Sequence, residues 1–133
     1  MYRFIFWLFA MASLWAFAII VNEKNEVLLC HRNDYDLWNL PWWKVEIWES
    51  PREAVIREVK EETWYDAEIS EFLWLYYKPE KDDLVFQFIC KIIWWEKTLN
   101  DEANKIEYFP TGEIPSNISH KQLERINDYY NWI

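Results

Sequence analysis

A cluster of charged side chains follows Glu49, where Glu58, Glu61 and Glu62 come directly after Arg57. At about 100° per residue, these three carboxylates fall on one side of a helix. Like charges at these spacings repel one another, so a compensating partner is expected. A hard divalent cation would supply it, because Mg²⁺ binds carboxylate oxygens and commonly shares them with substrate phosphates. The competing interpretation is a solvated charged face, with Arg57 at salt-bridge spacing from Glu61.

The segment that carries these carboxylates has the start and stop signals of a helix. Ser50 suits the N-cap and Pro51 the first helical position, and Glu53, three residues after the cap, completes a capping box. We expect the helix to run to about Thr63. The apolar stripe that should dock on a sheet consists of Val55, Ile56, Val59 and Thr63.

Short elements surround this helix along the rest of the chain. Apolar and alternating runs predict strands at residues 12–21, 26–31, 44–47, 66–77, 84–93 and 106–109. Residues 31–41 are predicted as a loop, and Ser119 as the cap of a second helix. A chain of 133 residues has the usual size of one domain. Strands interleaved with two helices therefore predict a single domain over residues 1–133, built as an α/β or α+β sandwich.

The order and spacing of the charged residues resemble the Nudix box. That motif reads Gly-x5-Glu-x7-Arg-Glu-U-x-Glu-Glu-x-Gly-U, where U is a bulky aliphatic residue. Counted from Trp43, Glu49 and the run from Arg57 to Glu62 fill every charged position, and Val59 fills the aliphatic one. Five charged residues at fixed spacing within a capped helix are a specific signal. The resemblance covers about residues 12–130 and implies an α/β fold, the Nudix-type α/β/α sandwich with a mixed central sheet.

The resemblance also implies an activity and a set of site residues. Nudix proteins hydrolyse a nucleoside diphosphate linked to another moiety, by attack of water on phosphorus with Mg²⁺ or Mn²⁺ bound at the box helix. Carried over, Glu58 and Glu62 would be the principal metal ligands, and Glu61 would bind directly or through water. Arg57 would pair with Glu49 to fix the preceding loop against the helix. An ADP-ribose-like nucleoside diphosphate sugar is the first substrate expected, ahead of a (d)NTP.

Other residues give weaker signals for the same site. Glu102 is the best candidate for one further carboxylate, with a solvated loop glutamate as an equal alternative. Arg32, at a predicted strand end, could reach a phosphate, although a surface arginine is the more common reading. Tyr35 and Trp38 could stack on a nucleobase, although packing explains them at least as well.

The net charge limits the class of partner, and the cysteines indicate the redox environment. The formal net charge of -9 and the pI near 4.7 argue against binding of a nucleic-acid polymer through phosphate neutralisation. A small nucleotide is the expected partner, and a homodimer is compatible with the sequence. Cys30 and Cys90 stand in apolar runs, as the reduced cysteines of cytosolic proteins do. A disulfide between them stays open.

The first 21 residues are apolar almost throughout, with Arg3 as their only charge, as in a membrane span or signal peptide. No small-residue cleavage site follows, and the run leads into residues 22–31 as a hairpin would. We therefore expect buried strands in a cytoplasmic protein without membrane contact. A membrane-tethered form is the alternative.

Tryptophan stands where the Nudix pattern has glycine. The chain has 1 glycine and 11 tryptophans, although glycine usually makes up about 7% of residues. A left-handed backbone is expected at Trp64, and it costs a residue other than glycine about 1–2 kcal/mol. The other tryptophans at expected glycine positions are Trp15, Trp42, Trp43, Trp48, Trp74, Trp94 and Trp95. So many changes of one kind leave an alternative open, a catalytically impaired nucleotide-binding or structural protein of the same fold.

Overall fold

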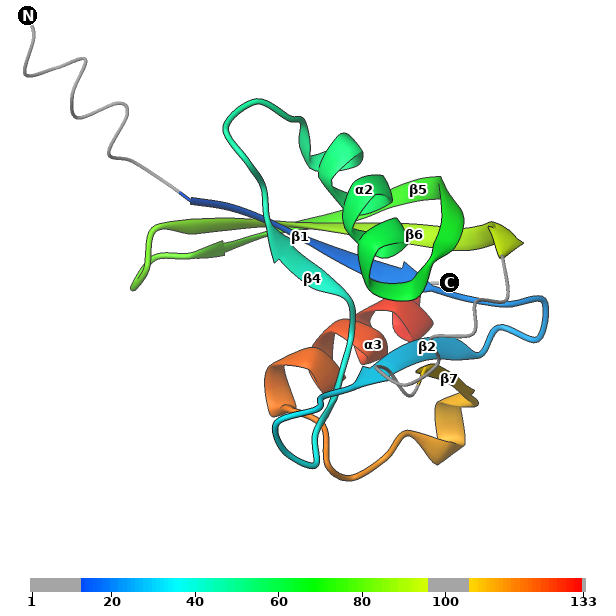
Figure 1. The fold of residues 1–133 in the computed structure, drawn as a ribbon. Coiled ribbons are helices and arrows are strands. Elements are labelled where there is room, and N and C mark those ends of the chain that lie inside the picture. Colours follow the sequence, from blue (N-terminus) through cyan, green and yellow to red (C-terminus); the bar gives the residue numbers. More distant parts are fainter. Residues whose placement is uncertain (1–12, 96–105, 133) are drawn as a thin grey trace, which may run out of the picture.

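The structure is a computed structural model that describes residues 13–95 and 106–132. Its elements are β1 (Ser13–Ile20), β2 (Val27–His31), β3 (Trp38–Asn39), β4 (Trp42–Lys44), α2 (Pro51–Thr63), β5 (Tyr65–Lys78), β6 (Asp83–Trp95), β7 (Ile106–Phe109), η1 (Thr111–Glu113) and α3 (His120–Trp132). Four strands form the larger sheet in the order β4-β1-β6-β5, and three form the smaller one in the order β3-β2-β7. Figure 1 shows α2 and α3 on opposite sides of the larger sheet.

The larger sheet is mixed, as the sequence predicted. Strand β1 runs parallel to β6 and antiparallel to β4, and β5 and β6 form a long antiparallel hairpin. The turn of that hairpin contains Asp82 at φ 52°, a left-handed conformation that aspartate tolerates. Because β1 lies between β4 and β6, both of its edges are paired, and the strand is buried over most of its length.

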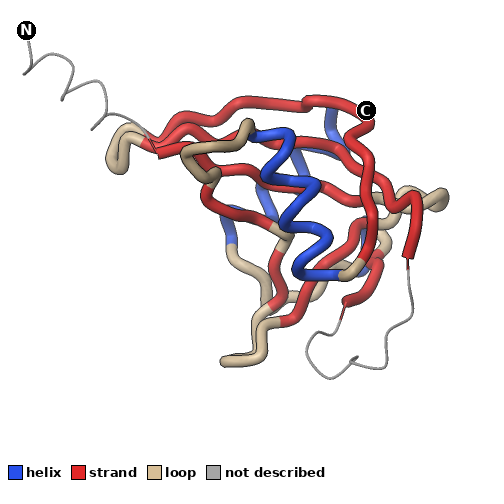
Figure 2. The backbone as a smooth tube through the Cα atoms, turned by 45° about the horizontal axis from the view of Figure 1, so that its top comes forward, coloured by secondary structure: helices blue, strands red, loops and turns tan. Residues whose placement is uncertain are grey.

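Alternating side chains of β1 divide the core into two clusters. Ala16, Ala18 and Ile20 pack with residues of α2, whereas Phe17 and Ile19 pack with residues of α3. Successive side chains of a strand point to opposite faces, so one central strand anchors a helix on each side. The predicted α/β/α sandwich is therefore confirmed, and Figure 2 shows α2 lying across the strands.

Strands β1 and β2 meet at a tight turn and then separate. The side chain of Asn22 accepts hydrogen bonds from the N–H groups of Lys24 (3.0 Å) and Glu26 (2.9 Å), and Val21 and Val27 form an isolated bridge. The hairpin expected here is therefore only a turn, because β2 continues into the smaller sheet with β3 and β7. This divergence opens the space between β2 and α2 where the pocket described below lies.

The predicted boundaries of α2 are confirmed. The Ser50 hydroxyl accepts from the Glu53 N–H at 3.2 Å, and the helix ends at Thr63, where the N–H of the following residue, Trp64, donates to the Lys60 carbonyl at 2.8 Å. The predicted apolar stripe is wrong at one position. Ile56 is 43% exposed, and Ala54 is buried against the sheet in its place.

Two other predicted boundaries differ from the structure. The extended piece expected at residues 44–47 lies earlier, at β4, and Ile47 is 98% exposed. The loop predicted for residues 31–41 contains the short strand β3. The second helix begins after Ser119 as predicted.

The described part of the apolar N-terminal run is β1, a buried strand as expected, whereas residues 1–12 lie outside the described residues. Among residues 13–95 and 106–132, no helix is both long and apolar enough to cross a membrane. Cys30 and Cys90 are free thiols, so the disulfide that the sequence left open is not formed.

Candidate functional site

Arg57 of α2, the helix that carries Glu58, Glu61 and Glu62, forms an ion pair with Glu49 in the loop before the helix. Its Nε and Nη2 atoms donate to the two oxygens of Glu49 at 2.9 and 2.6 Å, and the Glu49 side chain is only 5% exposed. The Arg57 bonds lower the pKa of Glu49 below its usual value, and burial opposes this. The pairing of Arg57 with Glu49 inferred from the sequence is confirmed.

The same guanidinium also holds two of the three helix carboxylates. Its Nη1 lies 2.7 Å from Glu58 Oε1 and 3.1 Å from Glu61 Oε2. The Glu58 side chain is 19% exposed and the Glu61 side chain 58%. These contacts, led by the bond to Glu49, raise the pKa of Arg57, so the guanidinium stays charged. Arg57 thus offsets the repulsion among the carboxylates that the sequence analysis identified.

Glu62 behaves differently from the other two carboxylates, because it lines a pocket. Burial, with a contribution from Glu58, raises its pKa above the usual value. The Trp43 indole opposes this effect and lowers the pKa of Glu62. The Nε1 atom of Trp43 is buried and makes no hydrogen bond of ordinary geometry within the described part of the chain. A half-buried carboxylate beside another carboxylate is a site where a cation is favourable.

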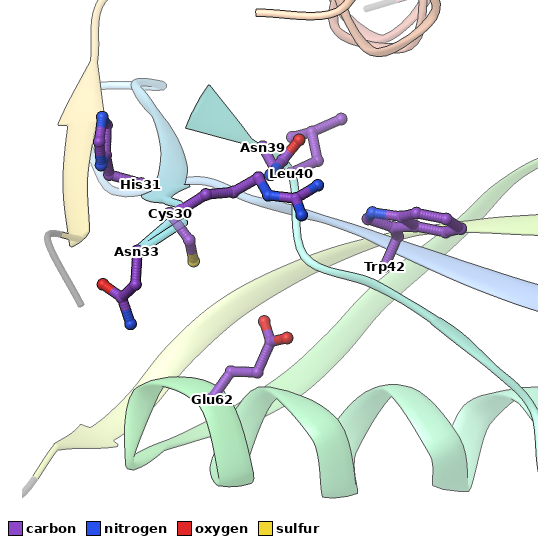
Figure 3. A pocket seen from close by; sticks show the side chains of 8 residues that line it. Cys30, His31, Asn33, Asn39, Leu40, Trp42 and Glu62 are labelled. Atoms are coloured by element: carbon purple, nitrogen blue, oxygen red, sulfur yellow. The ribbon is translucent and has the colours of Figure 1, made fainter. Parts of the chain in front are cut away.

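The pocket beside Glu62 has a volume of about 190 Å³ and lies between α2 and the smaller sheet. In Figure 3 the Glu62 carboxylate rises from α2 toward the wall that carries Cys30 and Asn33, and Trp42 flanks the opening. The lining residues are Cys30, His31, Arg32, Asn33, Asn39, Leu40, Trp42 and Glu62. Most are polar, so the pocket suits a polar ligand that reaches the carboxylate helix.

Arg32 lies in the pocket wall at the end of β2, as its position in the sequence suggested. Its Nε donates to Asp34 Oδ1 at 2.7 Å, and its guanidinium lies 4.2 Å from the centre of the Tyr35 ring. Tyr35 therefore packs on Arg32. Trp38 does not line the pocket, because its ring contacts His31 and Phe109 at 4.9 Å each.

Asn33, Asn39 and Cys30 are pocket residues that sequence reasoning missed. The two asparagines stand in a segment that looked like an ordinary polar loop, and only the divergence of β2 from β1 brings them opposite Glu62. Burial raises the pKa of Cys30 to about 12, and Glu62 adds to the effect. Because the nucleophilic form of cysteine is the thiolate, Cys30 is a neutral lining group.

The tryptophans at the start of the box motif take opposite sides of β4. Trp43 is buried beneath α2 in the core, with 8% exposure. Trp42 stacks on Phe17, with ring centres 5.6 Å apart, and contacts Trp15 at 4.9 Å. Trp64 adopts φ 64° and ψ 8° at the end of α2, which confirms the expected left-handed position.

Glu58, Glu61 and Glu62 lie on one helix, but their carboxylates do not form a metal-binding cluster in this structure. Among residues 13–95 and 106–132, no group of three or more His, Cys, Asp or Glu side chains could hold a metal ion as they lie. Arg57 draws Glu58 and Glu61 toward Glu49, whereas Glu62 points into the pocket. The proposed ligand set therefore stays a prediction. Glu102 lies outside the described residues.

The donor chemistry nevertheless fits a hard divalent cation. Oxygen ligands from carboxylates are what Mg²⁺ and Mn²⁺ prefer, and Glu58, Glu61 and Glu62 offer only such atoms. Glu58 and Glu62 influence each other electrostatically. Reorientation of side chains on one helix turn would bring their carboxylates together, since residues three and four apart are neighbours.

The chain is similar in sequence to known proteins over most of its length. The family model described as NUDIX domain matches residues 13–129. An ADP-ribose pyrophosphatase of Methanocaldococcus jannaschii is 31% identical over 121 residues, which cover 85% of this chain and 70% of that protein. A Bacillus subtilis (strain 168) protein with the provisional name 8-oxo-dGTP diphosphatase is 32% identical over 117 residues, covering 87% and 78%.

Solved structures show the same fold. An ADP-ribose pyrophosphatase of Streptococcus suis 89-1591 superposes with a TM-score of 0.71 at 24% identity, covering 90% of this chain and 92% of that one. A NUDIX hydrolase of Nitrosomonas europaea gives a TM-score of 0.74 at 21% identity, covering 91% and 90%. At these identities the likeness concerns the fold alone.

Proposed function

The chain belongs to the NUDIX family of pyrophosphohydrolases, and on this premise we propose that it hydrolyses the pyrophosphate linkage of a nucleoside diphosphate derivative. The observation that carries the proposal is the row of Glu58, Glu61 and Glu62 on α2, with Glu62 facing a polar pocket. Glu58, Glu61 and Glu62 would hold Mg²⁺ or Mn²⁺. Such an ion, when bound, neutralises diphosphate charge and lowers the pKa of a bound water.

The other site residues hold this arrangement in place. Arg57 anchors the loop through Glu49 and offsets the charge of Glu58 and Glu61. Arg32 lies across the pocket from α2 and would contact the anionic part of the substrate. Glu62, half buried at the pocket floor, is the carboxylate best placed to meet a diphosphate through the ion.

An ADP-ribose-like nucleoside diphosphate sugar is our first candidate substrate, and a (d)NTP is the second. Relatives named for ADP-ribose and for 8-oxo-dGTP support both. Asn33 and Asn39 line the pocket, and each side-chain amide can both donate and accept hydrogen bonds. This lining supports a ligand with several hydroxyl groups, as a sugar diphosphate has. We further propose that the protein is cytoplasmic and binds this small nucleotide without a nucleic-acid polymer or membrane as partner; a homodimer is compatible with this.

A second candidate function, nucleotide binding without turnover, is favoured by Trp42. This residue lines the pocket at a position where the Nudix pattern has glycine. The left-handed strain at Trp64 lies directly after the carboxylate helix, so it could also disturb the ligand positions. Under this alternative the pocket binds nucleotide, and no phosphate bond is broken.

A panel of nucleotides separates the two functions. Protein whose eleven tryptophans are verified by intact mass and absorbance at 280 nm is incubated with Mg²⁺ and ADP-ribose, dGTP or ATP. Our proposal predicts hydrolysis of ADP-ribose to AMP and ribose 5-phosphate. Binding of ADP-ribose by calorimetry without product would favour the non-catalytic alternative, and absence of both would contradict the proposal.

A further inference from the structure

A groove between β5 and α3, on the face of the larger sheet away from α2, is lined by charged and aromatic side chains that do not line the pocket beside Glu62. One stripe of α3 presents Lys121, Arg125, Asp128 and Trp132 at spacings of three and four residues. Alternate residues of β5 present Trp74, Tyr76 and Lys78 on one face. The Tyr76 hydroxyl donates to Asp128 Oδ2 at 2.6 Å, which fixes the two rows opposite each other.

The end of this groove at Trp132 contains a cavity of about 370 Å³. Its lining residues are Leu73, Trp74, Tyr76, Asp128, Asn131 and Trp132, and none of them lines the pocket beside Glu62. Trp74 is 54% exposed and Trp132 is 52% exposed, while Leu73 is buried. The volume falls in the range of small-molecule sites, about 300–1,000 Å³. Two half-exposed indoles on a buried floor offer surfaces on which a flat heteroaromatic ring can stack.

The charged group that lines the cavity, Asp128, is a hydrogen-bond acceptor. Burial, followed by the bond to Asp128, raises the pKa of Tyr76, so the phenol keeps its proton and donates it to Asp128. An ionised carboxylate accepts through about four lone-pair positions, so Asp128 retains acceptor capacity beyond this bond. A base edge with two adjacent N–H donors would match it. Guanine has such an edge, whereas adenine presents an acceptor at the corresponding ring nitrogen.

The other end of the groove is cationic in a chain of net charge -9. The Arg125 guanidinium lies 3.5 Å from the centre of the Tyr76 ring. Arg125 is 8% exposed, and its Nε has no hydrogen-bond partner within residues 13–95 and 106–132. Burial lowers the pKa of Lys78, and Lys121, Arg125 and Lys81 lower it further, while Asp83 opposes them. An anion at this end would relieve the crowding of positive charge.

We propose that the groove between β5 and α3 is a second nucleotide site, specific for a guanine nucleotide. The base stacks against Trp74 and Trp132 with its N–H edge on Asp128. The phosphate lies toward Lys78 and Lys121, with Arg125 supplying positive charge from beneath. Lys121 and Trp132 are eleven residues apart, which is about 16 Å along the helix, and this length accommodates a nucleoside monophosphate.

Titration calorimetry with GMP tests this site, because GMP has no pyrophosphate linkage to hydrolyse. We expect saturable binding, about tenfold weaker for AMP, which lacks the paired N–H edge, and weaker also for guanosine, which lacks the phosphate. Trp132→Ala should weaken GMP binding at least about tenfold, while Trp132→Phe keeps a ring and most of the affinity. Asp128→Asn should remove the preference for GMP over AMP.

Matched variants separate this site from the pocket beside Glu62. Lys121→Gln should weaken GMP but leave guanosine unchanged, whereas Lys24→Gln, at an exposed lysine in the turn after β1, should change neither. Glu62→Gln and Arg32→Gln should leave GMP binding unchanged, and Trp132→Ala should leave ADP-ribose hydrolysis unchanged. The proposal is overturned if GMP does not bind, or if Glu62→Gln or Arg32→Gln removes its binding while Trp132→Ala does not.

Discussion

Replacing Arg57 by glutamine should destabilise the fold, because the Arg57 side chain connects α2 to the preceding loop through Glu49. Glu49, with 5% of its side chain exposed, would lose both bonds from the guanidinium, at 2.9 and 2.6 Å. Within the described part of the chain, the Glu46 N–H, at 3.1 Å, is the donor that would remain to it. Glu58 and Glu61 would lose their neutralising partner as well.

The expected loss in free energy of unfolding is about 2–3 kcal/mol. Hydrogen bonds to charged groups contribute about 1.5–3 kcal/mol each, and breaking a fully buried ion pair costs about 3–5 kcal/mol. Arg57 is 33% exposed, so solvent screens part of the charge left on Glu49, and we place the loss below that range. At about 3 °C per kcal/mol for a domain of this size, the midpoint of thermal unfolding should fall by roughly 6–9 °C.

Urea unfolding of the parent and the Arg57→Gln variant at several pH values measures this loss. The folded pKa of Glu49 is lowered, so its stabilisation is complete above the unfolded value of about 4.3 and is lost as the pH falls through the folded pKa. The gap between the two proteins should therefore be widest near pH 7 and narrow in acid. Arg32→Gln is the control, because Arg32 and Asp34 are 39% and 55% exposed, and such pairs contribute under about 1 kcal/mol. An Arg57→Gln loss no larger than that of the control, and independent of pH, would refute the reasoning.

Three further predictions concern the tryptophans and the thiols. Trp64→Gly should be about 1 kcal/mol more stable than Trp64→Ala in urea unfolding, because both lack the indole and only glycine is unstrained at φ 64°; equal stabilities would contradict the left-handed end of α2. Trp42→Gly should open the pocket and raise kcat/KM for ADP-ribose by about tenfold, and a decrease would show that the indole supports the site. Cys30 and Cys90, whose pKa values burial raises to about 12, should react with a thiol reagent at pH 7.5 about a thousandfold more slowly than free cysteine; rapid labelling of the folded protein would contradict their burial.

Local signals in the sequence were enough to predict α2 and its caps. Ser50, Pro51 and Glu53 fix the start of the helix through bonds within four residues, and the left-handed residue at Trp64 fixes its end. The pairing of Arg57 with Glu49 was also predictable, since it follows from their place in the box motif. These features depend on neighbours in the chain, which the sequence shows directly.

The pocket wall depends instead on contacts between distant segments. Cys30 and Asn33 face Glu62 only because β2 leaves β1 and joins β7, a pairing between residues about eighty positions apart. No local pattern distinguishes that topology from a simple hairpin. The exposure of Ile56 has a similar origin, because the direction in which α2 crosses the sheet decides which of its apolar residues are covered.

The central claim is that Glu58, Glu61 and Glu62 hold a divalent ion against a pyrophosphate, and its most direct test is the Mg²⁺-dependent hydrolysis of ADP-ribose by mass-verified protein. The rate is compared for the parent, for Glu62→Gln, and for Glu71→Gln as a matched control at an exposed glutamate of β5. We predict that chelation with EDTA stops the reaction, that Glu62→Gln lowers the rate at least about 100-fold, and that Glu71→Gln leaves it unchanged. Equal rates for the parent and Glu62→Gln, or hydrolysis that continues without a divalent ion, would contradict the claim.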